Sequence, residues 1–249
     1  MHVDEHTIEL AGVPVFFRSA PAAGTPAVYL HGLPTSSDDW DAPLARTGGI
    51  APDLLGFGRS AKGGNLEFSV PGLADAVLAL LDHLEIAAAD VVGHQWGARV
   101  ARELAATAPD RVRRLVLISP RPRETRLTRL WRTPVLGELT MGSTTRGLLI
   151  RALRRGSSTE AAWPKARARA VWRYFDQGTQ RAILRLYRSD PPDAVEPPQP
   201  ALVLQGADDP YSEPDPGARA IAGAGHWPWL DRPEETIRLI SAFLQADGP

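Results

Sequence analysis

The feature that most limits the fold of this chain is a set of short apolar runs that each end abruptly at a glycine, histidine or serine. The runs cover residues 27–30, 90–92, 115–118 and 201–204. Apolar runs without polar alternation are typical of strands buried on both faces of a parallel sheet. Helical spacing of apolar residues separates them, as in 70–84 and 237–244. This order predicts an α/β fold with a mostly parallel, doubly wound sheet.

The alternation stops between residues 121 and 195, where apolar positions keep helical spacing only, and it resumes at Ala201. We therefore expect a core made of 1–120 and 196–249, with a helical cap, 121–195, inserted after a central strand. A proline-rich linker, 191–200, closes the cap. Residues 121–193 carry 16 Lys and Arg against 6 Asp and Glu, although the net charge of the chain is −1. The surplus indicates solvated helix faces, docking of the cap on an acidic core, or attraction of an anionic substrate.

Composition excludes several classes of function. The chain has no cysteine, so disulfides, thiolate catalysis and cysteine zinc sites are ruled out. No pair of histidines has metal-ligand spacing, and we expect neither a metal nor a cofactor. The near-zero net charge predicts no nucleic-acid partner, and the lack of a long apolar run predicts no membrane span. The polar, acidic start lacks a signal-peptide pattern, so we expect a cytoplasmic monomer or homodimer that acts on a small molecule.

Three segments that follow strands concentrate the chemistry: 93–97, 206–210 and 223–227. Ligands of open α/β sheets bind beyond the carboxyl ends of the strands. In the first segment Gly93 and Gly97 flank Gln95 at two residues on either side, a spacing that relieves crowding at a sharp strand-to-helix turn and exposes the central side chain. Asp209 and His226 follow in the other two segments, in the order nucleophile, acid, histidine.

Together with His-Gly-Leu-Pro-Thr-Ser-Ser at 31–37 and Asp-Leu-Leu-Gly-Phe-Gly-Arg-Ser at 53–60, these segments make the chain resemble the α/β-hydrolase family from about residue 7 to 246. Apart from Gln95, the turn is similar to the Gly-His-Asp-Trp-Gly of the epoxide hydrolase and haloalkane dehalogenase branch, whose nucleophile is aspartate. The resemblance implies an α/β-hydrolase fold, Asp209 as the acid and His226 as the catalytic histidine. It also implies an oxyanion hole made by the backbone N–H groups of Leu33 and Trp96.

Gln95 departs from that pattern because a primary amide has no ionisable group and is a poor nucleophile. We therefore expect no covalent intermediate. A His226–Asp209 pair can still deprotonate water or a substrate hydroxyl, while Gln95 positions the water or binds a carbonyl group. Only sixteen residues separate Asp209 from His226, which is too few for a helix in addition to the β-like residues 218–222 and makes this pairing less secure.

Four further residues are candidate substrate contacts. The resemblance suggests Tyr174 and Tyr187 as cap tyrosines that donate protons to an opening epoxide ring, and the alternative is aromatic packing under the cap. His31 and His94 flank the oxyanion loop and the turn, where structural roles are the alternative. Leu33 stands where dehalogenases often carry a halide-binding asparagine, so dehalogenation is disfavoured.

Three functions stay open at this point. The first is an enzyme that uses His226 and Asp209 on a small, apolar, oxygenated substrate, such as a natural-product intermediate, by hydrolysis, ring opening, cyclisation or elimination. The second is a non-catalytic relative that binds a ligand or a protein in the same pocket. The third is an epoxide hydrolase-like enzyme whose nucleophile has been replaced by Gln95.

Overall fold

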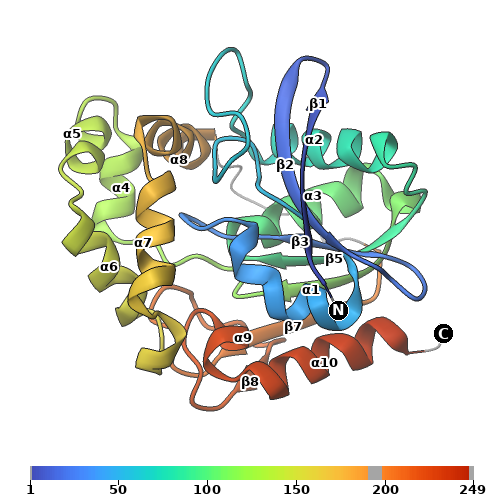
Figure 1. The fold of residues 1–249 in the computed structure, drawn as a ribbon. Coiled ribbons are helices and arrows are strands. Elements are labelled where there is room, and N and C mark those ends of the chain that lie inside the picture. The colour runs from blue at the N-terminus through green and yellow to red at the C-terminus, as the bar shows by residue number, and fades with distance from the viewer. Residues whose placement is uncertain (1, 190–197, 247–249) are drawn as a thin grey trace.

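A computed structural model describes residues 2–189 and 198–246 of the chain. Its centre is a sheet with the order β1-β2-β4-β3-β5-β6-β7-β8 (Figure 1). The strands are β1 (Asp4–Leu10), β2 (Val13–Ala20), β3 (Ala27–Leu30), β4 (Gly49–Pro52), β5 (Ala89–His94), β6 (Val112–Ile118), β7 (Ala201–Gly206) and β8 (Arg219–Ile221). β1 pairs antiparallel with β2, and β2 with β4, whereas the pairs from β4 through β3 to β8 are parallel. The predicted fold class is confirmed.

Burial explains why the apolar runs form this sheet. Every residue of β3 and β5 is buried, and in β6 only Arg113 is exposed. Helices cover both faces: α2 (Val70–His83) packs with α3 (Trp96–Thr107), and α1 (Asp41–Thr47) packs with α10 (Pro233–Gln245) on the opposite face (Figure 1). The remaining core segments are η1 (Ser37–Trp40), η2 (Pro109–Arg111) and α9 (Pro228–Asp231).

The described part of the predicted cap is helical and lies between β6 and β7 in the chain. It comprises α4 (Arg126–Arg132), α5 (Leu136–Gly142), α6 (Arg146–Arg155), η3 (Glu160–Ala162), α7 (Lys165–Tyr174) and α8 (Gln177–Ser189). These helices form a separate layer at the left of Figure 1, beside the edge where β3, β5 and β6 end. The predicted boundary at 195/196 and residues 191–197 of the linker lie outside the described residues.

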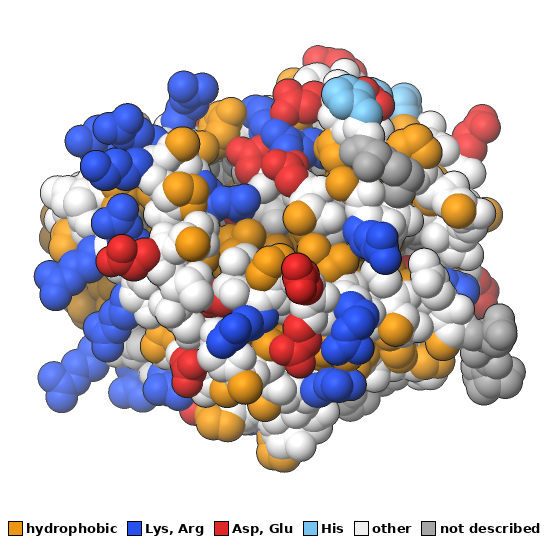
Figure 2. Space-filling model, turned by 60° about the horizontal axis from the view of Figure 1, so that its bottom comes forward, with side chains coloured by type: hydrophobic (Ala, Val, Ile, Leu, Met, Phe, Trp, Pro, Cys, Tyr) orange, Lys and Arg blue, Asp and Glu red, His pale blue; other side chains and the backbone are white. Residues whose placement is uncertain are grey.

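The basic surplus of the cap is largely a surface property. Figure 2 shows Lys and Arg side chains gathered at the left, on the side where Figure 1 places the cap helices. Among the described residues, three of the cap's charged groups form ion pairs with the core: the Asp176 carboxylate lies 2.8 Å from Lys62 Nζ, Arg167 lies 3.6 Å from Asp39, and Arg123 Nε lies 3.3 Å from Glu213. Solvated helix faces therefore account for most of the surplus, with local docking contacts in addition.

Candidate active site

Gln95 is the single residue between β5 and α3, and its backbone is left-handed, with φ 51° and ψ −109°. Two glycines make this turn sterically feasible. A Cβ atom on Gly93 would lie 2.4 Å from the Gly97 carbonyl oxygen, and one on Gly97 would lie 2.2 Å from the Leu30 carbonyl oxygen. Both distances are far inside van der Waals contact, so any side chain there would push α3 away from the sheet. The sequence-based explanation of the glycine spacing is confirmed.

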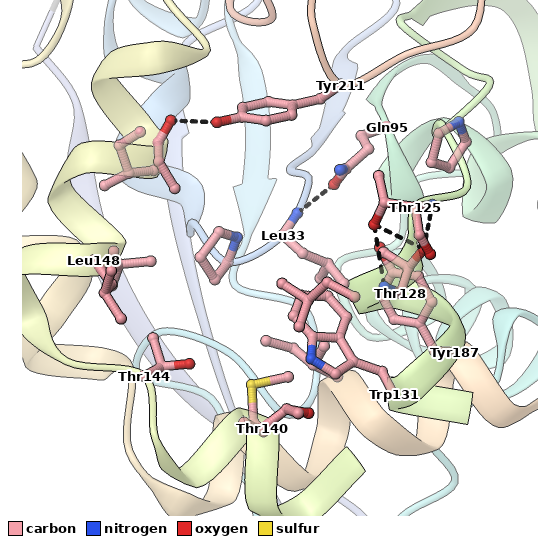
Figure 3. Close-up of a pocket in the computed structure, with 18 of the residues that line it drawn as sticks. Leu33, Gln95, Thr125, Thr128, Trp131, Thr140, Thr144, Leu148, Tyr187 and Tyr211 are labelled. Atoms are coloured by element: carbon pink, nitrogen blue, oxygen red, sulfur yellow. Dashed lines mark hydrogen bonds between the residues drawn. The ribbon is translucent and has the colours of Figure 1, made fainter. Parts of the chain in front are cut away.

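The side chain of Gln95 does not extend freely into the cavity. Its carbonyl oxygen Oε1 accepts a hydrogen bond of 2.8 Å from the backbone N–H of Leu33 (Figure 3). This N–H is one of the two groups expected to bind the oxygen of a substrate. The other belongs to Trp96, which is the first residue of α3 and therefore has no acceptor within its own helix. The side-chain carbonyl of Gln95 therefore already accepts a hydrogen bond from one of the two N–H groups that are expected to bind a substrate oxygen.

His226 and Asp209 lie together despite the short segment between them. The His226 Nδ1 atom is 2.9 and 3.0 Å from the two carboxylate oxygens of Asp209. A carboxylate only accepts, so Nδ1 carries the proton and donates it. The segment needs no helix because β8 has only three residues and returns the chain directly to the sheet edge. The sixteen residues between Asp209 and His226 are therefore enough to bring the two side chains into hydrogen-bond contact.

Further hydrogen bonds fix the acid. Asp209 accepts from the Ser119 hydroxyl at 2.7 Å and from the Tyr211 N–H at 2.8 Å. Burial by itself would raise the pKa of Asp209, but the neighbouring His226 ring and these hydrogen bonds outweigh it and hold that pKa well below its ordinary value. The carboxylate is therefore ionised at neutral pH and keeps His226 in one tautomer.

The opposite nitrogen of the ring, Nε2, is buried and has no hydrogen-bond partner in the described part of the chain. Buried polar atoms are normally satisfied, so such an atom indicates a place for water or a ligand. His226 lines a cavity of about 580 Å³, and Gln95 lines the same cavity. A neutral imidazole with a free Nε2 is the form that accepts a proton as a general base.

The cavity lies between the sheet edge and the cap, and its wall is mostly apolar. The cap residues on it include Leu127, Trp131, Met141, Leu148, Leu149, Leu153, Phe175, Ile183 and Tyr187. Polar groups on the wall come from four threonines, Thr125, Thr128, Thr140 and Thr144, and from Arg123 and Ser143. Tyr211 also lines the cavity, and its hydroxyl donates to the Ala152 carbonyl at 2.6 Å (Figure 3). This size and lining suit a small, largely apolar molecule.

Three of the predicted substrate contacts do not line this cavity. Tyr174 is not part of the cavity wall, because it ends α7 on the side facing the core, where its ring lies near Arg59 and Lys62. His31 is buried away from the cavity: its Nδ1 donates to the Gly32 carbonyl, and its Nε2 accepts from the Leu54 N–H.

His94 is the third. Its Nε2 donates to the backbone carbonyl of His226 at 2.9 Å, and its ring packs edge-on against that residue. It therefore supports the His226 loop and does not line the cavity. Burial lowers the pKa of both His31 and His94, which keeps them neutral. Of the four candidates only Tyr187 lies on the cavity wall.

Sequence reasoning did not identify Asp231, which ties the cap to the loop of His226. Its carboxylate accepts from the Gly225 N–H at 2.8 Å, and from Ser157 and Thr159 in the segment that follows α6. The His226 N–H also donates to the Gly156 carbonyl at 2.6 Å. The sequence places Asp231 just before a helix that begins with proline, but the partners of Asp231 come from the cap, which is distant in sequence. No local pattern could therefore reveal them.

Within residues 2–189 and 198–246, no three His, Asp or Glu side chains gather closely enough to hold a metal ion. None of the helices in these residues has the length and apolar composition that crossing a bilayer requires.

A mostly parallel sheet, a helical cap over its carboxyl edge, and a His–Asp pair beside a strained strand-to-helix turn define a capped α/β protein of the hydrolase type. Residues 27–239 match the sequence profile of the alpha/beta hydrolase family. The chain belongs to that family.

Individual relatives are similar over part of their length. A haloalkane dehalogenase of Mycolicibacterium paratuberculosis is 37% identical over 108 residues, which are 41% of this chain and 36% of that protein. The aligned segments span about a third of the length of the curated relatives that the chain matches.

Solved structures are similar over nearly the whole chain. Cfl2 from Burkholderia cenocepacia superposes with a TM-score of 0.87 at 24% identity, covering 98% of this chain and 96% of that one. Epoxide hydrolase A from Mycobacterium thermoresistibile superposes with a TM-score of 0.82 at 22% identity, covering 98% and 99%. At these identities the likeness establishes the fold.

Proposed function

We propose that this protein is an enzyme that uses His226 as a general base, oriented by Asp209, on a small, largely apolar, oxygenated substrate held under the cap. The observation that carries the proposal is the unpartnered Nε2 atom of His226 at the cavity, with its other nitrogen bound to an ionised carboxylate. Such a pair deprotonates water or a substrate hydroxyl, a step worth about 10²–10⁴-fold in rate.

Gln95 takes the place of the family's nucleophile in this proposal but does not attack the substrate, because its amide has no ionisable group. The reaction then proceeds without a covalent intermediate, by hydrolysis, ring opening, cyclisation or elimination. Backbone N–H groups of Leu33 and Trp96 bind the developing oxyanion once the substrate oxygen has displaced Gln95 Oε1. One such donor is worth about 10²–10³ in rate.

Turnover of a panel of small lactones, esters and epoxides by the wild type and by His226→Ala tests the proposal. We expect His226→Ala to lose about 10²-fold or more of the wild-type rate, and Ser119→Ala, which removes one hydrogen bond from Asp209, to lose much less. Equal turnover by the wild type and His226→Ala would overturn the proposal. The circular dichroism spectrum of each variant is the control for folding.

One observation favours a second candidate, a non-catalytic relative that binds a ligand in the same cavity: Gln95 Oε1 already occupies the Leu33 N–H. This candidate predicts saturable binding of apolar ligands with no turnover in any preparation. Gain of turnover in Gln95→Asp or Gln95→Ser would show that the rest of the site is competent.

A further inference from the structure

The carboxamide of Gln95 occupies the site in the way an acyl substrate would. Its carbonyl oxygen receives the Leu33 N–H at 2.8 Å, and Gln95 and the buried, unpartnered Nε2 of His226 share one cavity. The left-handed backbone at Gln95 fixes where the side chain starts, and the Leu33 bond fixes where its carbonyl ends. We propose that the site hydrolyses this carboxamide, so that Gln95 becomes a glutamate and ammonia is released. The inference rests on the general base of the proposed function.

The reaction needs only water as a second reactant. A water molecule in the cavity gives a proton to His226 Nε2 as its oxygen bonds to the amide carbon, and the carbonyl electron pair moves onto Oε1, which the Leu33 N–H stabilises. When the carbonyl re-forms, the carbon–nitrogen bond breaks. The leaving nitrogen takes the proton back from His226 and departs as ammonia, which then removes the acid proton. The products are a carboxylate and ammonium, and nothing is oxidised or reduced.

The product changes what the site can do. A carboxylate at the turn can attack an electrophilic carbon, which the amide cannot. It also places a negative charge on the wall of the cavity that His226 lines. The conversion would therefore act as a maturation step that replaces an inert amide with a nucleophile, and the reaction without a covalent intermediate belongs to the chain that still carries glutamine at position 95.

The chain contains a matched control glutamine. Gln205 is as buried as Gln95, each being 9% exposed. Its Oε1 also accepts from a backbone N–H, that of Asp215, at 3.1 Å, and its amide group donates to the Glu213 carbonyl. Gln205 is not part of the cavity wall. A general base and an oxyanion donor together are worth about 10⁴–10⁷ in rate, so Gln95 should convert while Gln205 does not.

The experiment is peptide mass spectrometry on wild type, His226→Ala and Asp209→Asn, each analysed directly after purification and again after prolonged incubation near neutral pH. We expect the peptide with position 95 to gain about 1 Da in the wild type, fully or progressively. It should stay unchanged in His226→Ala and convert more slowly in Asp209→Asn. Incubation in heavy-oxygen water should place one labelled oxygen in the new carboxylate of any molecules still unconverted at the start.

A wild-type protein that keeps glutamine at position 95 at the level of Gln205 would overturn the inference, as would equal conversion in the wild type and His226→Ala. Circular dichroism and the midpoint of denaturation show whether the variants are folded, and Asp209→Asn supplies a second reading if His226→Ala is not. The test needs no external substrate. Conversion without turnover of any panel compound would count against the proposed function only, and His226-dependent turnover without conversion would count against this inference only.

Discussion

The left-handed backbone at Gln95 should make glycine more stabilising than alanine at this position, the reverse of the usual order. A Cβ atom in this region costs about 1–2 kcal/mol. Glycine loses about 0.4–1 kcal/mol relative to alanine through the greater entropy of the unfolded chain. The midpoints of these two ranges leave Gln95→Gly more stable than Gln95→Ala by about 0.8 kcal/mol, within limits of about 0 and 1.6 kcal/mol. Both variants lose the same carboxamide and the same bond to Leu33, so their comparison isolates the Cβ atom.

Ala79 gives the control, because it is exposed in the middle of α2. There Ala79→Gly should destabilise by about 0.5–1 kcal/mol. The free energies of unfolding come from urea denaturation followed by tryptophan fluorescence. For a chain of this size 1 kcal/mol corresponds to about 2–4 °C in Tm, so thermal melts provide a second measurement. If Gln95→Gly is less stable than Gln95→Ala by the same amount that separates the Ala79 pair, the backbone at Gln95 is not strained.

Three further predictions concern stability. Burial alone would raise the pKa of Asp53. The hydrogen bonds from Arg59 and its positive charge outweigh burial, so the pKa of Asp53 is lowered. Asp53→Ala should lose about 3 kcal/mol in urea denaturation at neutral pH and less at acid pH, because this stabilisation is lost as the pH falls below about 4; an equal loss at both would contradict it. Burial raises the pKa of Asp39 to about 7. The wild type should therefore lose stability relative to Asp39→Asn as the pH rises from about 4 to 7, by up to about 1.4 kcal/mol per pH unit. A difference in stability that stays constant over this pH range would refute the prediction. Trp163 is fully buried, and Trp163→Ala should cost about 3–5 kcal/mol, clearly more than Trp172→Ala at a half-buried position.

The central strands were predictable from sequence because burial on both faces removes polar residues and leaves a clear signal. β1 carries the sequence Asp-Glu-His-Thr-Ile-Glu-Leu and lies at the sheet edge, where polar side chains are tolerated. β4 is Gly-Ile-Ala-Pro, which contains two residues that rarely form strands. These two strands gave no comparable pattern. β1 is defined by its pairing with β2, and β4 by its pairing with β2 on one side and β3 on the other.

The residues of the candidate site were also predictable only in part. Gln95, Asp209 and His226 were predictable as neighbours because each follows a strand of one parallel sheet, whose carboxyl ends share an edge. The positions of Tyr174 and Tyr187 were not, because the face of a cap helix that meets the cavity depends on how the helices pack. The bond from the Leu33 N–H to Gln95 depends on one side-chain conformation, which no spacing encodes.

That bond bears on the choice between a catalyst and a binding protein. A hydrogen bond of this kind contributes about 0.5–1.5 kcal/mol net, so a substrate oxygen that displaces Gln95 Oε1 loses about tenfold or less in affinity. The unpartnered Nε2 of His226 points the other way, since a buried polar atom without a partner costs about 1–3 kcal/mol when nothing fills its site. A pure binding protein would gain stability by replacing the His226–Asp209 pair with apolar residues, whereas replacing His226 alone would leave the buried Asp209 carboxylate without its partner. The retained imidazole, held by Asp209 and supported by His94, is the costlier feature and therefore the better guide to function.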